Sequence, residues 1–235
     1  MKDKRQLQAV RTYITLAAQT HAAPLISFGG NGNYVPTVAQ YTAAVKAFIH
    51  EFPSVKLYTA WDEPDWIYRS LSRNPRLAAA YFNALVKVCH GCTVAAGDLH
   101  LPAASLGKWI RAYRAGLHYR PAAWALHDYL DIRSHSTAQL RAMEATTSGP
   151  IWLDEVAGVV KRGHWTYPNQ SVAAQGRDEQ FLFSLPKRFH RITRIYHYQW
   201  QANAKVPWDS ALIGPLGGLR PAFYTFANAL HGKLP

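Results

Sequence analysis

Two glutamates, Glu63 and Glu155, stand at the ends of short apolar runs that lie far apart in the sequence. Glu63 follows Asp62 directly after the run 55–61, and Glu155 lies near the end of the run 151–156. Two opposed carboxyl groups can cleave a glycosidic bond, because one protonates the leaving oxygen while the other, ionised, attacks the anomeric carbon. A single glutamate at a strand end more often caps a helix or forms an ion pair, so the hypothesis depends on both.

The elements that must position these carboxylates follow from hydrophobic periodicity. Apolar residues at helical spacing predict seven helices, at 7–17, 38–52, 77–88, 106–117, 140–147, 181–189 and 223–230. Six nearly continuous apolar runs lie between them, at 24–28, 55–61, 93–97, 122–127, 151–156 and 195–200. Such runs are typical of strands buried on both faces of a parallel sheet. The strict alternation predicts an α/β fold.

Polar residues cluster just after each run. In a parallel (β/α)8 barrel of the TIM type the carboxyl ends of all strands open on one face, which carries the chemistry. Because about six βα units are visible and the chain starts in a helical pattern, we expect a barrel that is incomplete at its N-terminus. An open doubly wound sheet would also accommodate six strands, but the sequence has no G-x-G-x-x-G turn. At 235 residues, we expect a single barrel domain over 1–235.

Composition narrows the function classes. Apolar residues make up 49% and charged residues 17% of the chain, so it is expected to fold. The net charge of +12 permits an anionic partner, although the basic residues are scattered, as on an ordinary solvated surface. The aromatic content of 13% suggests a surface that stacks on flat groups.

Two further observations concern location and redox chemistry. The sequence has no apolar run of the roughly 20 residues that a membrane helix needs, and no hydrophobic region typical of a signal peptide. We therefore expect a soluble chain without an export signal. Its localisation stays open, and the parent protein could be secreted. Cys89 and Cys92 form a C-x-x-C at an expected helix-to-strand turn. They favour a local disulfide or two free thiols over a redox pair, and no zinc or haem pattern accompanies them.

The two glutamate segments resemble a known group of enzymes. The segment 61–64, Trp-Asp-Glu-Pro, resembles the Asn-Glu-Pro acid/base motif on the fourth strand of clan A retaining glycoside hydrolases, the (β/α)8 enzymes that include families 5 and 39. The segment 152–155, Trp-Leu-Asp-Glu, resembles their nucleophile motif on the seventh strand. The resemblance implies that Glu63 is the general acid/base and that Glu155 is the nucleophile.

Other aromatic and polar residues are candidates for substrate binding. The resemblance implies that His127 and Tyr129 contact the substrate or the nucleophile, and that Trp200 is an aromatic platform under the sugar. From the residues alone, a histidine on an apolar strand is equally well explained as a core residue. Trp165 and Trp208 fall in expected loops after the last strands, where they could form an aromatic rim that binds sugar faces.

The sequence departs from the family pattern in two ways. Asp62 stands where the family has asparagine; its carboxylate could accept the hydrogen bond of the sugar 2-hydroxyl and raise the pKa of Glu63 by like-charge repulsion. The missing N-terminal strands would expose the edge of the first strand, near 25–28. We therefore expect either a trimmed chain or self-association through that edge.

The sequence thus predicts a retaining glycoside hydrolase that cleaves O-glycosidic bonds of a poly- or oligosaccharide, with no metal or organic cofactor. One alternative is a catalytically impaired barrel remnant that still binds carbohydrate. A second is a basic nucleic-acid-binding domain, for which no helix-turn-helix, RNA-binding or zinc signature appears. Asp98, after the third run, could orient a partner or cap the next helix, and the helix cap is the favoured interpretation.

Overall fold

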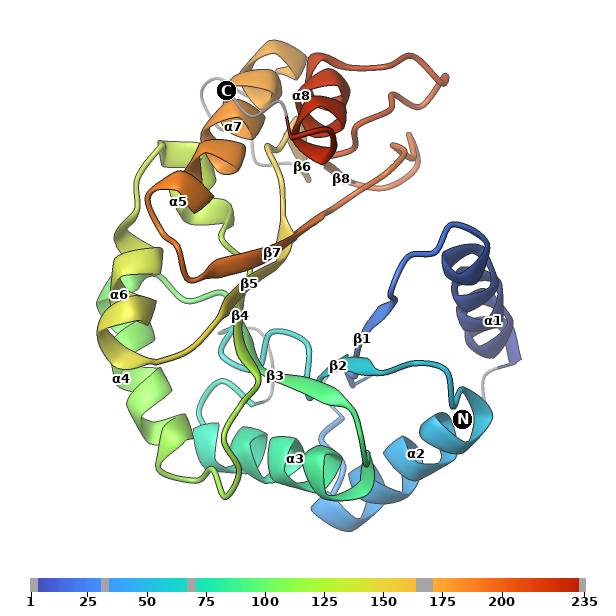
Figure 1. The fold of residues 1–235 in the computed structure, drawn as a ribbon, viewed down its shortest axis with the longest axis vertical. Coiled ribbons are helices and arrows are strands. Elements are labelled where there is room, and N and C mark those ends of the chain that lie inside the picture. Colours follow the sequence, from blue (N-terminus) through green and yellow to red (C-terminus); the bar gives the residue numbers. More distant parts are fainter. Residues whose placement is uncertain (1–3, 31–33, 67–70, 164–170, 233–235) are drawn as a thin grey trace. The chain divides into compact units, whose positions relative to one another are not determined.

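The computed structural model describes residues 4–30, 34–66, 71–163 and 171–232 (Figure 1). The chain forms two compact units. The first contains Met1–Leu101 and Gly107–Ala125, and the second contains Pro102–Leu106 and Leu126–Pro235. The single domain expected from the length stays a prediction, and each unit is described separately below.

Helices and strands alternate along the described chain, in the order α1 (Lys4–Gln19), β1 (Leu25–Ser27), α2 (Val38–Glu51), β2 (Leu57–Thr59), α3 (Pro75–Val88), β3 (Thr93–Leu99), α4 (Ala103–Arg114), β4 (Ala123–Leu126), α5 (Tyr129–Ser134), α6 (Ala138–Thr146), β5 (Ile151–Val156), β6 (Lys161–Arg162), α7 (Val172–Ser184), a 3₁₀ helix (Leu185–Lys187), β7 (Ile192–His197), β8 (Trp208–Asp209) and α8 (Pro221–Leu230). The pairs β1–β2, β2–β3 and β5–β7 are parallel. The predicted fold class, α/β of the (β/α)8 type with about six βα units, is confirmed. None of the helices in the described residues has the length and apolar character of a membrane span.

Parallel register aligns the strands of the first unit. Ile26 of β1 pairs with Tyr58 of β2, and Tyr58 pairs in turn with Val94 of β3. The segments that follow β2 and β3 therefore emerge at the same edge of the sheet. Among the described strands β1 pairs only with β2, so self-association through its outer edge stays a prediction.

Aromatic side chains build much of the core of the first unit. The rings of Tyr41 on α2 and Tyr81 on α3 stack at 4.4 Å, and Trp61 packs against Tyr81 at 5.1 Å. Tyr58 on β2 stacks on Phe28 at 6.0 Å. The aromatic content that suggested a stacking surface is thus partly explained by this core.

Local sequence accounts for the helices that cover this sheet. Thr37 and Gln40 form a capping box at the start of α2, and Asn74 caps α3, in which Pro75 occupies the first turn. After α3 a disulfide joins Cys89 to Cys92. The local disulfide was one of the two states expected for these thiols.

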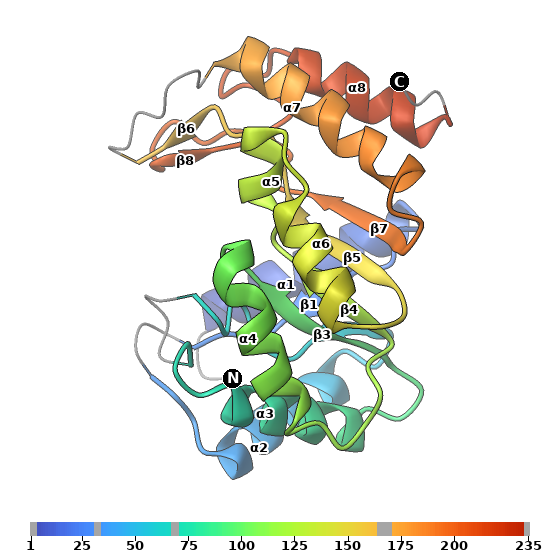
Figure 2. The same cartoon turned by 90° about the vertical axis from the view of Figure 1, so that its left-hand side faces the viewer.

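In the second unit α7 and α8 pack side by side (Figure 2). Their contact includes the rings of Phe183 and Phe226, whose centroids lie 6.0 Å apart. Gly176 allows the close approach, because a Cβ there would lie 3.0 Å from Cβ of Pro221. Both helices lie next to β7, which pairs with β5.

Three features of the second unit differ from the sequence-based expectations. The last sheet strand covers Ile192–His197 rather than 195–200, so Trp200 lies beyond it. The helix predicted at 181–189 covers Val172–Ser184, because the later apolar residues Leu185 and Phe189 are buried in a 3₁₀ turn and the loop after it. The short elements α5, β6 and β8 were not predicted, since two to six residues are too few to show periodicity.

Candidate active site

Glu63 lies in the loop after β2, four residues beyond the end of that strand. Its backbone has a φ of 42°, in the left-handed region that residues with a Cβ rarely adopt. Such a conformation costs about 1–3 kcal/mol and persists only where the surroundings impose it. The loop is held by two backbone hydrogen bonds, from Asp62 N–H to the carbonyl of Phe28 (2.7 Å) and from Trp66 N–H to the carbonyl of Glu63 (3.2 Å).

Asp65 anchors the same loop to the end of β3. Its carboxylate is buried and accepts hydrogen bonds from the backbone N–H of His100 (2.9 and 3.0 Å) and of Leu101 (2.9 Å). Nδ1 of His100 lies 3.6 Å from Oε1 of Glu63, and both side chains are 14% exposed. Asp65 and His100 therefore belong to the surroundings of Glu63. Sequence reasoning missed Asp65, although it follows Glu63 by only two residues.

Asp98 ties the strand ends of the first unit together. It is buried, and its Oδ2 accepts hydrogen bonds from the hydroxyls of Thr59 (2.7 Å) and Ser27. These partners come from β2 and β1, whereas Asp98 itself is on β3. The interpretation of Asp98 as a helix cap is therefore wrong: it cross-links three strands at the edge from which the Glu63 loop emerges.

Glu155 lies on β5 in the second unit, one residue before the end of the strand. The hydroxyl of Tyr129 donates a hydrogen bond to its Oε1 at 3.1 Å. The ring of Tyr129 is buried and makes an edge-to-face contact with Trp208 at 5.1 Å. Ala157 and Val159 complete the packing around it. The phenol is thus fixed by packing, and it directs one donor at the half-buried carboxylate.

His127 and Asp154 form a second buried pair beside these residues in the sequence. Nε2 of His127 lies 3.7 Å from Oδ2 of Asp154, and the two side chains are 3% and 4% exposed. Asp128, the next residue, is fully buried. Burial raises the pKa of the Asp128 carboxyl well above its usual range, and the negative charge of Asp131 raises it further.

The predicted aromatic residues have different surroundings. Trp200 is 59% exposed and makes an edge-to-face contact with Phe223 at 6.0 Å. Trp208 lies on β8 rather than in a loop; it is half-buried against Tyr129, and its indole N–H donates to Oγ of Ser210 at 2.9 Å. Trp165 lies outside the described residues.

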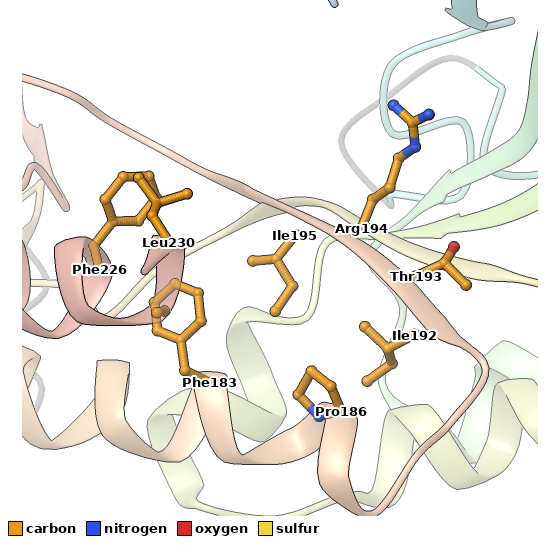
Figure 3. Close-up of a pocket in the computed structure, with 9 residues that line it drawn as sticks. Phe183, Pro186, Ile192, Thr193, Arg194, Ile195, Phe226 and Leu230 are labelled. Atoms are coloured by element: carbon orange, nitrogen blue, oxygen red, sulfur yellow. The ribbon is translucent and has the colours of Figure 1, made fainter. Parts of the chain in front are cut away.

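A pocket of about 310 Å³ lies between the end of α7, β7 and α8 (Figure 3). Phe183, Ile195, Phe226 and Leu230 gather on one side of it, and the guanidinium of Arg194 points away from them. The described residues that line it include no carboxylate and no predicted site residue. This pocket therefore lacks the groups needed for acid/base chemistry.

The structure thus groups the predicted site residues in two sets. In the first unit Glu63 and Asp62 share a loop with Asp65, against His100. In the second unit Tyr129 contacts both Glu155 and Trp208, His127 faces Asp154, and Trp200 contacts Phe223.

Comparison with known proteins adds a family to this geometry. The family model described as glycosyl hydrolase catalytic core matches residues 20–226. No curated protein sequence matches the chain.

Among solved structures, the chain is similar in fold to a monomeric β-xylosidase from Caulobacter crescentus, with a TM-score of 0.59 and 12% identity over 86% of this chain and 51% of that one. A family 39 glycoside hydrolase from Bacteroides cellulosilyticus has a TM-score of 0.64 and 14% identity over 100% of this chain and 54% of that one. A family 10 endoxylanase from a sugarcane soil metagenome has a TM-score of 0.65 and 10% identity over 92% of this chain and 80% of that one. The chain spans about half the length of the first two proteins.

Sequence identities this low show the fold alone. The match to the family model is the stronger finding, because it covers most of the chain and includes both glutamate segments. It confirms the predicted resemblance at the level of the family: the chain belongs to the glycosyl hydrolase catalytic core family.

Proposed function

We propose that this chain is a retaining glycoside hydrolase in which Glu155 is the nucleophile and Glu63 is the general acid/base. The observation that carries the proposal is the hydrogen bond of 3.1 Å from the packed phenol of Tyr129 to the Glu155 carboxylate, at the carboxyl end of a strand in a chain of this family. In parallel barrels that end of the strands is where the chemistry takes place.

The Tyr129 hydroxyl has two effects on Glu155 in this proposal. A donor aimed at a carboxylate stabilises the ionised form, which is the form that attacks carbon. It also limits rotation of the carboxyl group, so that the attacking oxygen keeps its direction toward the anomeric carbon. Orientation of this kind supplies a large part of the barrier reduction in well-aligned reactions.

Glu63 has a different task, because it must give up a proton and take one back. In the first step it protonates the glycosidic oxygen as the bond to the anomeric carbon breaks and the ester to Glu155 forms. In the second step the ionised Glu63 removes a proton from water, whose oxygen displaces Glu155 and releases the sugar with retained configuration. His100, whose Nδ1 lies 3.6 Å from Glu63, is near enough to influence this proton through charge.

The other predicted residues have proposed roles in binding the substrate. Trp200 offers an exposed ring on which a sugar can stack, and Asp62 offers a carboxylate for a sugar hydroxyl. Trp208 has a supporting role, because its ring holds Tyr129. His127, paired with the buried Asp154, and Trp165 remain proposed contacts of the substrate.

Replacement of Glu155 tests the proposal. Glu155→Gln should reduce turnover of an aryl glycoside by at least about a thousandfold, whereas the matched control Glu144→Gln, on α6 of the same unit, should leave it unchanged. Adding azide to Glu155→Gly should restore reaction and give a glycosyl azide of inverted configuration, because azide attacks the face that the carboxylate has vacated. Turnover by Glu155→Gln close to that of the unmodified protein would refute the assignment.

The substrate screen for these experiments starts from the structural neighbours. One of them is named a β-xylosidase and another an endoxylanase, so aryl β-xylosides and xylan come first, followed by other aryl glycosides. Binding of a glycan without release of reducing sugar would instead support the alternative, a carbohydrate-binding remnant.

A further inference from the structure

Helix α7 directs two polar side chains into the interior of the second unit. Gln175 and Glu179 stand one turn apart on the same face of α7, and both are completely buried. The amide of Gln175 donates hydrogen bonds to the carbonyls of Ser210 (3.0 Å) and Ala211 (2.9 Å). This helix therefore holds backbone of a neighbouring segment as well as covering the sheet.

Glu179 makes the contacts that matter for the proposed nucleophile. Its Oε1 accepts a hydrogen bond from the backbone N–H of Gly158 at 2.9 Å, and Nε2 of His197 lies 2.9 Å from the same oxygen. Gly158 follows Glu155 by three residues, and His197 is the last residue of β7. One carboxylate oxygen therefore joins the ends of the two paired strands.

The loop after β5 approaches α7 so closely that only glycine fits. A Cβ at position 158 would lie 2.8 Å from the carbonyl oxygen of Gln175 and 2.8 Å from Cβ of Asp178. The amide of Gly158 can reach Glu179 because no side chain separates them. The β5 segment is thus fastened to α7 just after it has carried Glu155 to the sheet edge.

Stability alone does not explain a charged side chain in this place. Oε2 of Glu179 and Nδ1 of His197 are buried and have no hydrogen-bond partner in the described part of the chain. Unmet polar atoms of this kind cost free energy, and apolar residues of similar volume usually stabilise a core as well or better than a buried polar pair. The arrangement does fix the relative position of β5 and β7, which apolar contacts specify less sharply.

We propose that Glu179 is a positioning residue, which holds Gly158 and His197 and thereby fixes the direction of the Glu155 carboxylate. This inference rests on the proposed function of Glu155. The proposal adds a requirement. The hydrogen bond from the Gly158 N–H must be accepted by an oxygen on a side chain as long as that of Glu179, whereas the negative charge of Glu179 is dispensable.

Three substitutions at Glu179 separate the effects of side-chain length, negative charge and packing. Glu179→Gln keeps an oxygen acceptor at the same reach, so kcat should stay within about threefold of the unmodified value. Glu179→Met removes the acceptor at similar volume, and kcat should fall about 10- to 100-fold with KM within about threefold, because a displacement of about 1 Å can cost this much. Glu179→Asp keeps the negative charge, but its side chain is one methylene too short to reach Gly158, so its loss of kcat should resemble that of Glu179→Met. If Glu179→Met does not fold, Glu179→Asp takes its place in the test.

Two controls on the same helix exclude a general effect of destabilisation. Gln180→Met places the same side chain on the exposed face of α7 and should leave kcat unchanged. Leu182→Ala opens a cavity at a completely buried position and should lower Tm. At temperatures below its unfolding transition, Leu182→Ala should nevertheless have the kcat of the unmodified protein. If the Met and Asp variants lose no more kcat than Leu182→Ala, or if Glu179→Gln is as impaired as they are, the proposal is wrong.

Hydrogen exchange of the Gly158 amide, followed by NMR, tests the positioning without any need for activity. The amide should be protected in the unmodified protein and in Glu179→Gln, and should exchange at least about tenfold faster in Glu179→Met and Glu179→Asp. Unchanged protection in both of these variants would overturn the inference. If the protein releases no sugar but the exchange rates change as expected, the proposed function fails while Glu179 keeps its role of holding the β5 segment.

Discussion

The two glutamates are held in opposite ways. Glu63 lies in a loop, on left-handed backbone, beside the imidazole of His100. Glu155 lies within a strand and receives a hydrogen bond from the phenol of Tyr129, whose ring is packed on Trp208. One carboxyl group therefore has an ionisable imidazole as its neighbour, and the other has a phenolic hydrogen-bond donor.

This contrast matches the two tasks of the proposed mechanism. A general acid/base must change its protonation state in both half-reactions, and a nearby ionisable group can tune that change. A nucleophile must stay ionised and point at one atom, for which a fixed donor on rigid secondary structure is suited. The neighbours of the two glutamates therefore support different roles for residues that are chemically identical.

The largest expected effect tests whether the roles are assigned the right way round. Glu63→Ala should lower kcat/KM about 10²- to 10⁴-fold for substrates with poor leaving groups, because their departure needs a proton, and much less for dinitrophenyl glycosides. Azide should rescue the second step and give a product of retained configuration. A glycosyl azide of inverted configuration from Glu63→Ala would mean that Glu63 is the nucleophile and Glu155 the general acid/base.

Removal of the phenol hydroxyl tests the nucleophile side of the comparison. Tyr129→Phe deletes one hydrogen bond to a charged group, so kcat should fall about 10- to 100-fold with a small change in KM. Tyr58→Phe is the matched control, because it deletes a buried hydroxyl that bonds to the carbonyl of Val55 in the first unit. Steady-state kinetics in which the two variants behave alike would mean that Tyr129 does not orient Glu155.

The anchor of the acid/base loop is expected to give a smaller effect. Asp65→Asn leaves one acceptor oxygen for the backbone N–H groups of His100 and Leu101, and stability should fall by about 1.5–3 kcal/mol. The loss of kcat/KM, about tenfold, should be greater for poor leaving groups than for good ones, since only the poor ones need the proton that Glu63 gives to the leaving oxygen. Equal losses for both classes of aryl glycoside would show that Asp65 does not act through Glu63.

Sequence reasoning succeeded where periodicity is long. Helices such as Val38–Glu51 and Pro75–Val88 and the buried strand Ile151–Val156 were predicted almost to the residue, because each repeats its pattern over several turns or a full strand. The residues that support the glutamates were harder to find. Asp65 and Glu179 act through backbone amides of segments distant in sequence, and nothing in the residue types at those amides indicates the contact.

The buried carboxyls show the same limit. Asp98 was interpreted as a helix cap because of its place after a strand, but its partners Ser27 and Thr59 come from two other strands. Only the sheet register brings them together. Short elements such as α5 were not predicted for another reason: the six residues Tyr129–Ser134 are fewer than two full helical turns.

The smallest expected effect concerns the pH dependence of stability around Tyr129. Because burial and then Asp131 raise the pKa of Asp128, folding favours its neutral form. The unfolded chain ionises this carboxyl above about pH 4, so its stabilising contribution is complete below that pH and declines as the pH rises toward the folded pKa. Asp128→Asn, which is neutral at every pH, should therefore raise Tm relative to the unmodified protein more at pH 7 than at pH 4.

Asp209 is the control with the opposite sign. Burial alone would raise its pKa, but hydrogen bonds and charge from Arg220, assisted by the Ala211 N–H, outweigh this and lower it. Its contribution is present above about pH 4 and is lost as the pH falls through the lowered pKa, so Asp209→Asn should lower Tm at pH 7 and less so at pH 3. Thermal unfolding of both variants across this range measures the two signs together. If Asp128→Asn followed the same pH trend as Asp209→Asn, Asp128 would be ionised in the folded protein, and a negative charge would lie next to the residue that orients Glu155.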